Sequence, residues 1–209
     1  EPAVYERNKE AAHMECRFVF SCKNTGKICL FTDTGQLHTI KVQDIPFGKF
    51  RDKGTPVDNI SNFSSEKERI LYATSQTELN LRQVIFVTAQ SMMKLVDGGE
   101  FDVSKRTVAA TRLNEGDTVV SVMSLLEQRN IVLQTKEGYF LRFSIEEIPE
   151  KKKNAVGVRG MKLGPKDLVE QVYYTQNAVE ASIEYKDKTV ILNHLKAGKR
   201  DGKGTKIRV

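Results

Sequence analysis

The chain has 209 residues, 39% of them apolar, and its 33 Lys plus Arg against 27 Asp plus Glu give a formal net charge of +6. No run approaches the roughly 18 apolar residues that a spanning helix needs, and the first residues lack a secretory apolar stretch, so we expect a cytosolic protein. The cysteines and histidines show no ligand spacing, which predicts neither a disulfide framework nor a metal site.

The first segment, residues 3–14, is polar and predicts a helical linker. The β-rich part of the chain begins near residue 15 with a strand-like run at 16–22. A hairpin pattern follows at 27–46, where two strand-like runs flank a turn at Gly35. Alternating apolar and polar residues on both sides of a glycine turn are typical of a β-hairpin.

The hairpin pattern recurs three times further along the chain, at 83–101, 130–149 and 181–195. The anchors at the turns are spaced 56, 47 and 50 residues apart; they are Thr32, Thr88, Thr135 and Tyr185. Further β-rich runs precede the later hairpins, at 69–74, 118–126 and 168–175, and we expect a turn at 65–69.

Each hairpin is followed by a basic loop and another short strand-like run, such as 54–60 or 157–163. Four short strands in about 50 residues, repeated four times, predict propeller-like blades rather than a helical solenoid. We therefore expect an all-β domain over 15–209 behind a linker at 1–14. Its repeats are expected at about 15–60, 61–113, 114–163 and 164–209.

Aligned on the turn anchors, the basic loops fall at the same place in each repeat. They are loop 1 (48–54), loop 2 (101–107), loop 3 (151–157) and loop 4 (198–204). Cations at the same position in successive blades form a stripe along one rim, which a long polyanion can follow. Lys and Arg supply charge and counterion release, while glycines let the backbone approach a phosphate and leave amides free to donate.

No recognition helix, zinc finger or aromatic platform is evident in the sequence. We therefore expect contacts to DNA backbone phosphates, with bending of the duplex as the main energetic cost. The candidate DNA-binding residues are Lys49, Arg51, Lys53, Gly54, Lys105, Arg106, Lys151, Lys152, Lys153, Arg159, Lys199, Arg200, Gly202, Lys203 and Gly204. Three cations on hairpin strands would extend this track: Lys41, Lys94 and Arg142.

Residues 115–163 resemble one blade of the C-terminal domain of bacterial type IIA topoisomerase A subunits, the family that comprises the A subunits of DNA gyrase and of topoisomerase IV. The resemblance covers about 15–209. It implies a β-pinwheel of about four four-stranded blades, in which neighbouring blades exchange strands and a basic outer rim bends or wraps duplex DNA with little sequence preference.

Gyrase A subunits carry a seven-residue box of the form Gln-Lys/Arg-Arg-Gly-Gly-Lys/Arg-Gly in one blade, which tight chiral wrapping requires. Loop 4 keeps five of these positions but has Gly198 and Asp201 at the other two, and loop 1 departs further. These departures favour a resemblance to the A subunit of topoisomerase IV, while the A subunit of gyrase remains an alternative.

The resemblance further implies a non-catalytic domain, because the nucleophilic tyrosine of the family lies in the upstream breakage-reunion core. It implies no cofactor in this domain, with ATP and Mg²⁺ bound elsewhere in the enzyme. The implied partners are duplex DNA, the catalytic core of the same A subunit, and the ATPase B subunit, with which the A subunit forms a heterotetramer. No membrane is implied. The expected location is the nucleoid of the bacterial cytoplasm. The alternative is a protein-binding propeller without a nucleic-acid role, since fold alone does not fix function.

Overall fold

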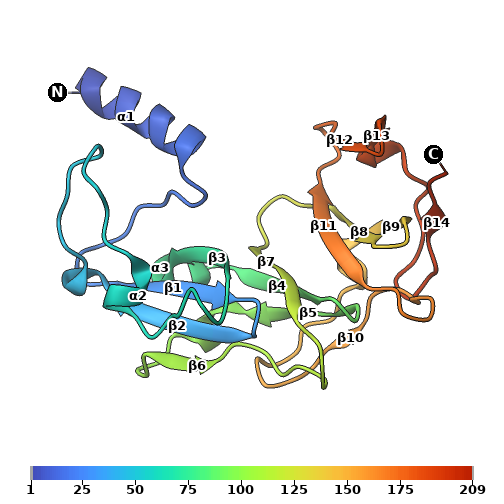
Figure 1. Ribbon diagram of the computed structural model, residues 1–209, viewed down its shortest axis with the longest axis horizontal. Coiled ribbons are helices and arrows are strands. Elements are labelled where there is room, and N and C mark those ends of the chain that lie inside the picture. The colour runs from blue at the N-terminus through green and yellow to red at the C-terminus, as the bar shows by residue number, and fades with distance from the viewer. Residues whose placement is uncertain (1, 209) are drawn as a thin grey trace.

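Four β-hairpins, one in each repeat, form the framework of the structure, a computed structural model that describes residues 2–208 (Figure 1). The hairpin strands are β1 (Lys27–Thr32) with β2 (Gln36–Lys41), β4 (Gln83–Thr88) with β5 (Met92–Asp97), β8 (Asn130–Thr135) with β9 (Tyr139–Ser144), and β12 (Ser182–Tyr185) with β13 (Lys188–Ile191). All four predicted hairpins are confirmed. Glu1 and Val209, the outermost residues of the expected linker and domain, lie outside the described residues.

Each of the first three hairpins is completed by two strands from the next repeat. Strand β3 (Ile70–Ser75) pairs with β1, and β6 (Thr107–Ala109) pairs with β2, which gives a sheet of order β3-β1-β2-β6. In the same way β7 (Val119–Ser124) and β10 (Val158–Arg159) join the second hairpin, and β11 (Val169–Thr175) and β14 (Thr205–Lys206) join the third. The strand exchange that the resemblance implied is therefore present.

Two predicted strands are absent, and the last blade is smaller than expected. Residues 16–22 contain no strand, and residues 54–60 contain a helical turn, α2 (Val57–Ile60). In the exchange scheme these two runs would pair with the hairpin of a preceding repeat, and the described residues contain no hairpin before β1. The fourth sheet has only its own two strands, so the described chain contains three four-stranded sheets and one two-stranded sheet.

Few helices accompany the sheets. The predicted helix near the N-terminus is present as α1 (Pro2–Glu15), while α3 (Gln76–Leu79) was not predicted; its first turn is capped by the Ser75 side chain, which accepts a hydrogen bond from the Glu78 amide. A 3₁₀ turn follows the second strand of each hairpin: η1 (Val42–Asp44), η2 (Gly98–Phe101), η3 (Ile145–Glu147) and η4 (Leu192–His194). Across residues 2–208, none of the helices combines the length and apolar character needed to cross a membrane.

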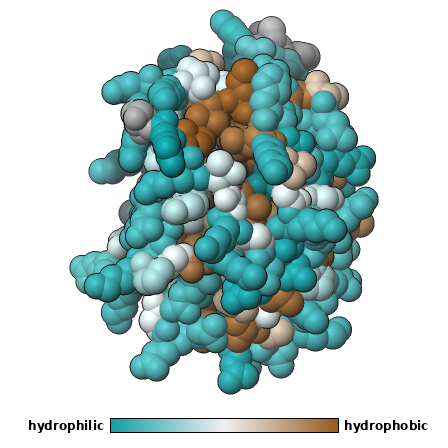
Figure 2. Space-filling view, turned by 90° about the vertical axis from the view of Figure 1, so that its right-hand side faces the viewer, coloured by the Kyte–Doolittle hydropathy of each residue, from teal (hydrophilic) through white to brown (hydrophobic). Residues whose placement is uncertain are grey.

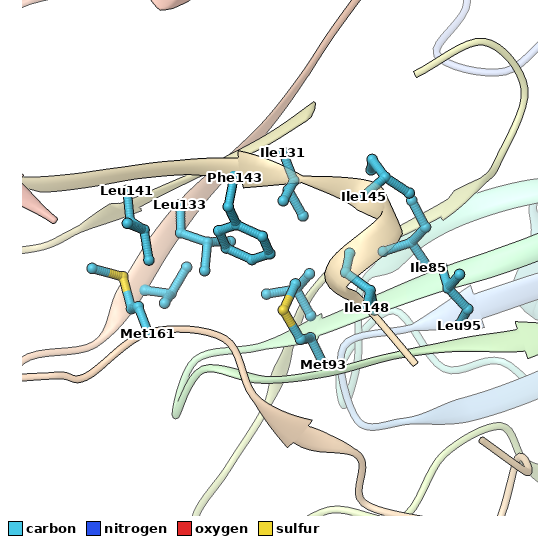
Figure 3. Close-up of a cluster of buried hydrophobic side chains, with 12 residues drawn as sticks. Ile85, Met93, Leu95, Ile131, Leu133, Leu141, Phe143, Ile145, Ile148 and Met161 are labelled. Atoms are coloured by element: carbon cyan, nitrogen blue, oxygen red, sulfur yellow. The ribbon is translucent and has the colours of Figure 1, made fainter. Parts of the chain in front are cut away.

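The hydrophobic core lies between successive sheets. Apolar side chains from the β4–β5 and β8–β9 hairpins meet in one cluster, where Met93, Ile131 and Phe143 are at most 1% exposed (Figure 3). A second cluster joins the first two sheets, with the Phe31 and Phe101 rings 5.0 Å apart at an edge-to-face angle. Apolar side chains also gather on the face viewed from the β12–β13 end of the molecule (Figure 2).

Candidate nucleic-acid interface

Three of the four basic loops lie along the outer strand of the preceding hairpin. The Thr39 amide of β2 donates to the Arg106 carbonyl of loop 2, the Lys151 amide of loop 3 donates to the Leu95 carbonyl of β5, and the Gly198 amide of loop 4 donates to the Arg142 carbonyl of β9, each at 2.8 Å. Because β2, β5 and β9 occupy equivalent places in their sheets, these loops repeat along the same edge of the successive sheets.

Loop 1 has a different setting. It lies beside α1 (Figure 1). Val4 and Ala11 of α1 line a common cleft with Lys49, Phe50 and Arg51. The short strand expected after this loop is replaced by α2. The alignment that placed four loops in one setting therefore holds for loops 2 to 4 and fails for loop 1.

The predicted cations are largely available at the surface. All of them are exposed except Lys153 and Arg200, which are half-buried. Within residues 2–208, eight of these side chains make no hydrogen bond or ion pair: Lys49, Arg51, Lys53, Lys105, Lys151, Lys152, Lys199 and Lys203. The Arg106 guanidinium makes one long contact, 3.3 Å to the Ile60 carbonyl. These residues can carry charge to a polyanion without breaking a strong internal bond, and their DNA contacts stay a prediction.

Arg159 already has an anionic partner. Its guanidinium forms a two-pronged ion pair with Asp201 of loop 4, through Nε with Oδ1 and through Nη2 with Oδ2 at 3.1 Å. Hydrogen bonds from Arg159 lower the pKa of the Asp201 carboxyl, and the charges of Arg159, Lys162 and Arg200 lower it further. Asp201 is one of the two departures from the seven-residue box.

The Arg200 side chain bonds loop 4 to neighbouring backbone segments. Its Nε donates to the Glu147 carbonyl and its Nη1 to the Arg159 carbonyl, both at 2.9 Å. The sequence placed Arg200 among the candidate DNA-binding residues, but two of its donors are occupied by the protein backbone. Its three remaining N–H donors, on Nη1 and Nη2, and its charge are what it can offer a phosphate.

Lys94 is not on the rim track. It is fully buried, and its Nζ donates to three carbonyls of the loop 3 region, those of Lys152, Lys153 and Ala155, at 2.6 to 3.0 Å. Burial lowers the pKa of Lys94 to about 8, although the negative charge of Glu100 acts to raise it. The expectation that Lys94 extends the track is therefore wrong, because its ammonium holds loop 3 in shape.

Arg142 also has an internal role, since its Nη1 donates to the carbonyls of Asn193 and Leu195. It therefore ties β9 to the turn after the fourth hairpin, and its contact with DNA stays a prediction for the donors that remain. Lys41, at the end of β2, is exposed and remains compatible with it.

Carboxylates occupy backbone amides that the sequence suggested would be free. Glu100 Oε1 accepts the Lys153 amide of loop 3 at 3.2 Å, and Glu147 Oε1 accepts the Arg200 amide of loop 4 at 3.1 Å. In loop 1 the Lys49 amide donates to Asp52 at 2.7 Å. These amides are not available to phosphate while the carboxylates hold them, so the loops present side-chain charge to a ligand.

The two glutamates were missed by sequence reasoning, although a signal exists. Each lies 53 residues before the loop residue whose amide it accepts, and each sits in the 3₁₀ turn after a hairpin. The repeat spacing could have paired these positions. A charged side chain in a polar turn is common and by itself indicates no partner.

The loop glycines allow close contact with the neighbouring strand. A Cβ on Gly204, where φ is +74°, would come within 2.4 Å of the Phe140 carbonyl oxygen of β9. Gly202 is half-buried against the Leu141 side chain, whereas Gly54 has open space around it. Gly202 and Gly204 therefore have a packing role in the exchanged segment, and only Gly54 keeps the room for an approaching phosphate that the sequence suggested.

Comparisons with known proteins agree with this architecture. The family described as DNA gyrase C-terminal domain, beta-propeller, matches residues 82–125 and 129–175. The DNA gyrase A subunit of Lawsonia intracellularis is 32% identical over 143 residues, which are 68% of this chain and 17% of that protein. The DNA topoisomerase 4 A subunit of Streptococcus pyogenes is 31% identical over 155 residues, 71% of this chain and 19% of that protein.

The chain thus spans less than a fifth of the length of these curated relatives. A solved structure described as the C-terminal domain of DNA topoisomerase IV superposes with a TM-score of 0.79 at 22% identity, over 96% of this chain and 67% of that one. Together with the exchanged strands and the repeated hairpins, these matches show that the chain belongs to the family of C-terminal domains found in the A subunits of DNA gyrase and topoisomerase IV.

Proposed function

We propose that this domain binds and bends duplex DNA through the exposed cations of its basic loops, with little sequence preference. The observation that carries the proposal is the repetition of loops 2 to 4 along one edge of the successive sheets, each fixed to the hairpin before it. Regularly spaced cations on a curved edge suit a bent polyanion, and the absence of base-reading elements from the sequence suits contacts to phosphates.

We further propose that the domain acts within a larger enzyme. The domain is non-catalytic and holds DNA next to the cleavage site of an ATP-dependent type IIA topoisomerase, in the bacterial cytoplasm at the nucleoid. Its proposed partners are the catalytic core of the same A subunit, together with the ATPase B subunit. ATP and Mg²⁺ act elsewhere in that enzyme, and this domain holds no cofactor. The support is its family membership and the names of its relatives.

Salt titration of DNA binding tests the proposal. Binding of the 209-residue chain to a duplex of about 100 base pairs is measured from about 50 to 300 mM salt, and the logarithm of affinity should fall linearly with the logarithm of salt, with a slope of about −0.9 per phosphate contacted. A flat response, or no binding at about 50 mM salt, would reject DNA binding and favour the protein-binding alternative.

A matched pair of double variants locates the contact. Lys199→Gln with Lys203→Gln removes two unpaired cations of loop 4 and should reduce the steepness of the salt slope by about 1.8. The control is Lys67→Gln with Lys136→Gln, which removes two exposed lysines outside the loops. If both pairs reduce the slope equally, net charge rather than loop 4 explains the binding.

A further inference from the structure

The contact between Arg159 and Asp201 joins two successive blades at the proposed DNA-binding edge. Arg159 lies in β10, directly after loop 3, and Asp201 lies 42 residues later in loop 4. The two side chains are 54% and 38% exposed, so the pair sits in contact with solvent. Among the ion pairs of the described chain, it is the one that includes a predicted DNA-binding cation, Arg159.

The backbone, not the carboxylate, holds the two segments together at this point. The Asp201 amide donates to the Gly160 carbonyl at 2.7 Å, and the Lys162 amide donates to the Gly202 carbonyl at 2.8 Å. The Arg200 guanidinium adds its bond to the Arg159 carbonyl. Removing the charge of Asp201 therefore leaves the framework that places Arg159 beside loop 4.

The backbone of Asp201 is in the left-handed region, with φ at +70°. Asp and Asn enter this region more readily than other residues with a side chain, so Asn can replace Asp201 without new strain. The substitution Asp201→Asn therefore removes the negative charge at this position and leaves the backbone conformation unchanged.

A carboxylate and a phosphate present the same paired oxygens to a guanidinium, which binds either in a two-pronged arrangement. Exposed ion pairs contribute little to stability, so an incoming phosphate can displace the carboxylate. We propose that Asp201 is an internal competitor of DNA phosphate for the guanidinium of Arg159 and thereby weakens DNA binding at this edge. This inference rests on the proposed DNA-binding function.

The test compares Asp201→Asn with Asp187→Asn in the 209-residue chain. Asp187 is a close control because it is also an aspartate at positive φ, +63°, and it is exposed in the β12–β13 turn without a side-chain partner in the described chain. Both variants remove one negative charge. Far-UV circular dichroism and thermal unfolding establish that each variant is folded.

Asp201→Asn should raise affinity for the duplex roughly three- to tenfold at about 100 mM salt and steepen the salt slope by about 0.9, as one more phosphate contact forms. Asp187→Asn should change affinity by less than about twofold and leave the slope unaltered. In an Arg159→Ala background, Asp201→Asn should have no larger effect than Asp187→Asn.

Equal effects of the two aspartate variants, or weaker binding by Asp201→Asn, would overturn the inference while leaving DNA binding intact; weaker binding would mean that the pair positions loop 4 for DNA. Failure of the wild-type chain and of every variant to bind DNA would overturn the proposed function and the inference with it.

Discussion

Glu68 shows how a single side chain fastens an exchanged strand. It lies just before β3, its Oε1 accepts hydrogen bonds from Thr32 and Thr34, and its Oε2 contacts His38 Nε2 at 2.5 Å. His38 Nδ1 in turn lies 2.8 Å from the Thr107 hydroxyl of β6. One network therefore touches both strands that the second repeat donates to the first sheet. Buried polar groups of this kind are costly to leave unpaired.

Burial acts to raise the pKa of Glu68, but hydrogen bonds from Thr34, Thr32 and His38 outweigh it and place the pKa below its usual value. A carboxyl with a lowered pKa in the folded state stabilises the fold above its unfolded pKa, and that stabilisation is lost as pH falls through the folded value. The loss should therefore begin below about pH 4.5.

Glu68→Gln is expected to lower the free energy of unfolding by about 1–2 kcal/mol at pH 7, because a charged acceptor of three hydrogen bonds is lost. Its deficit relative to wild type should shrink as the pH falls from about 4.5 towards 3. Urea unfolding across this range measures both effects. Glu66→Gln is the control, since the Glu66 side chain is exposed and makes no hydrogen bond or ion pair in the described chain. A deficit that is equal in both variants or independent of pH would contradict this role.

Among single residues, the sequence identified the exposed cations but not the internal contacts of the buried ones. Lysine is the default surface residue, so Lys94 was expected at the rim. Its three acceptors are carbonyls 58 to 61 residues further along the chain, and no local pattern reports such contacts. Asp201 was recognised as a departure from the box, but its bond to Arg159 depends on how two blades meet.

The exchanged short strands are the elements that join neighbouring blades, and glycine makes their approach possible. Gly157 directly precedes β10, has φ at +102°, and lies so close to β5 that an added Cβ would come within 2.4 Å of the Met93 carbonyl oxygen. Strand β10 pairs Val158 with Met93. A side chain at position 157 must therefore push the short strand away from its partner.

Gly157→Ala is expected to destabilise the fold by about 2–3 kcal/mol, from backbone strain together with steric overlap, and to speed hydrogen exchange of the β10 amides. Gly116→Ala is the matched control, because Gly116 has φ at +72° but nothing within 4 Å of an added Cβ. The control should lose only about 1 kcal/mol. Similar losses for both would mean that steric overlap with β5 is not the cause.

Element by element, the sequence predicted what is local. The four hairpins, α1 and the turn near 65–69 follow from alternation, polarity and turn residues within a few positions. The partner of each additional strand is set by a repeat about 35 to 70 residues away, which alternation cannot report. The runs at 16–22 and 54–60 have strand-like composition but remain unpaired in the described chain, so composition alone misassigned them.

The whole molecule presents a basic edge of limited extent. Loops 2 to 4 repeat along it, loop 1 lies beside α1, and the Arg159–Asp201 pair cancels part of the charge at loop 4. No loop carries the full seven-residue box. We therefore expect the duplex to be bent across three loops rather than carried through a wrap of fixed hand.

Two DNA assays of the 209-residue chain distinguish bending from wrapping of a fixed hand. The domain should accelerate cyclisation of short duplexes, and ligation of nicked circles in its presence should leave the linking number close to that of free DNA. The Lys199→Gln, Lys203→Gln variant should lose the effect on cyclisation. A linking-number change that grows with the amount of bound domain would contradict bending without a fixed hand.

The exchange of strands also imposes an order in time. The first sheet begins at Lys27, yet its last strand ends at Ala109, so the ribosome must deliver 83 residues before that sheet can close. During synthesis each of the first three hairpins keeps an open edge on its second strand until most of the following repeat has emerged. Open edges attract other strands, so slow translation through residues 98–109 would prolong the interval in which a nascent chain is exposed to misassembly.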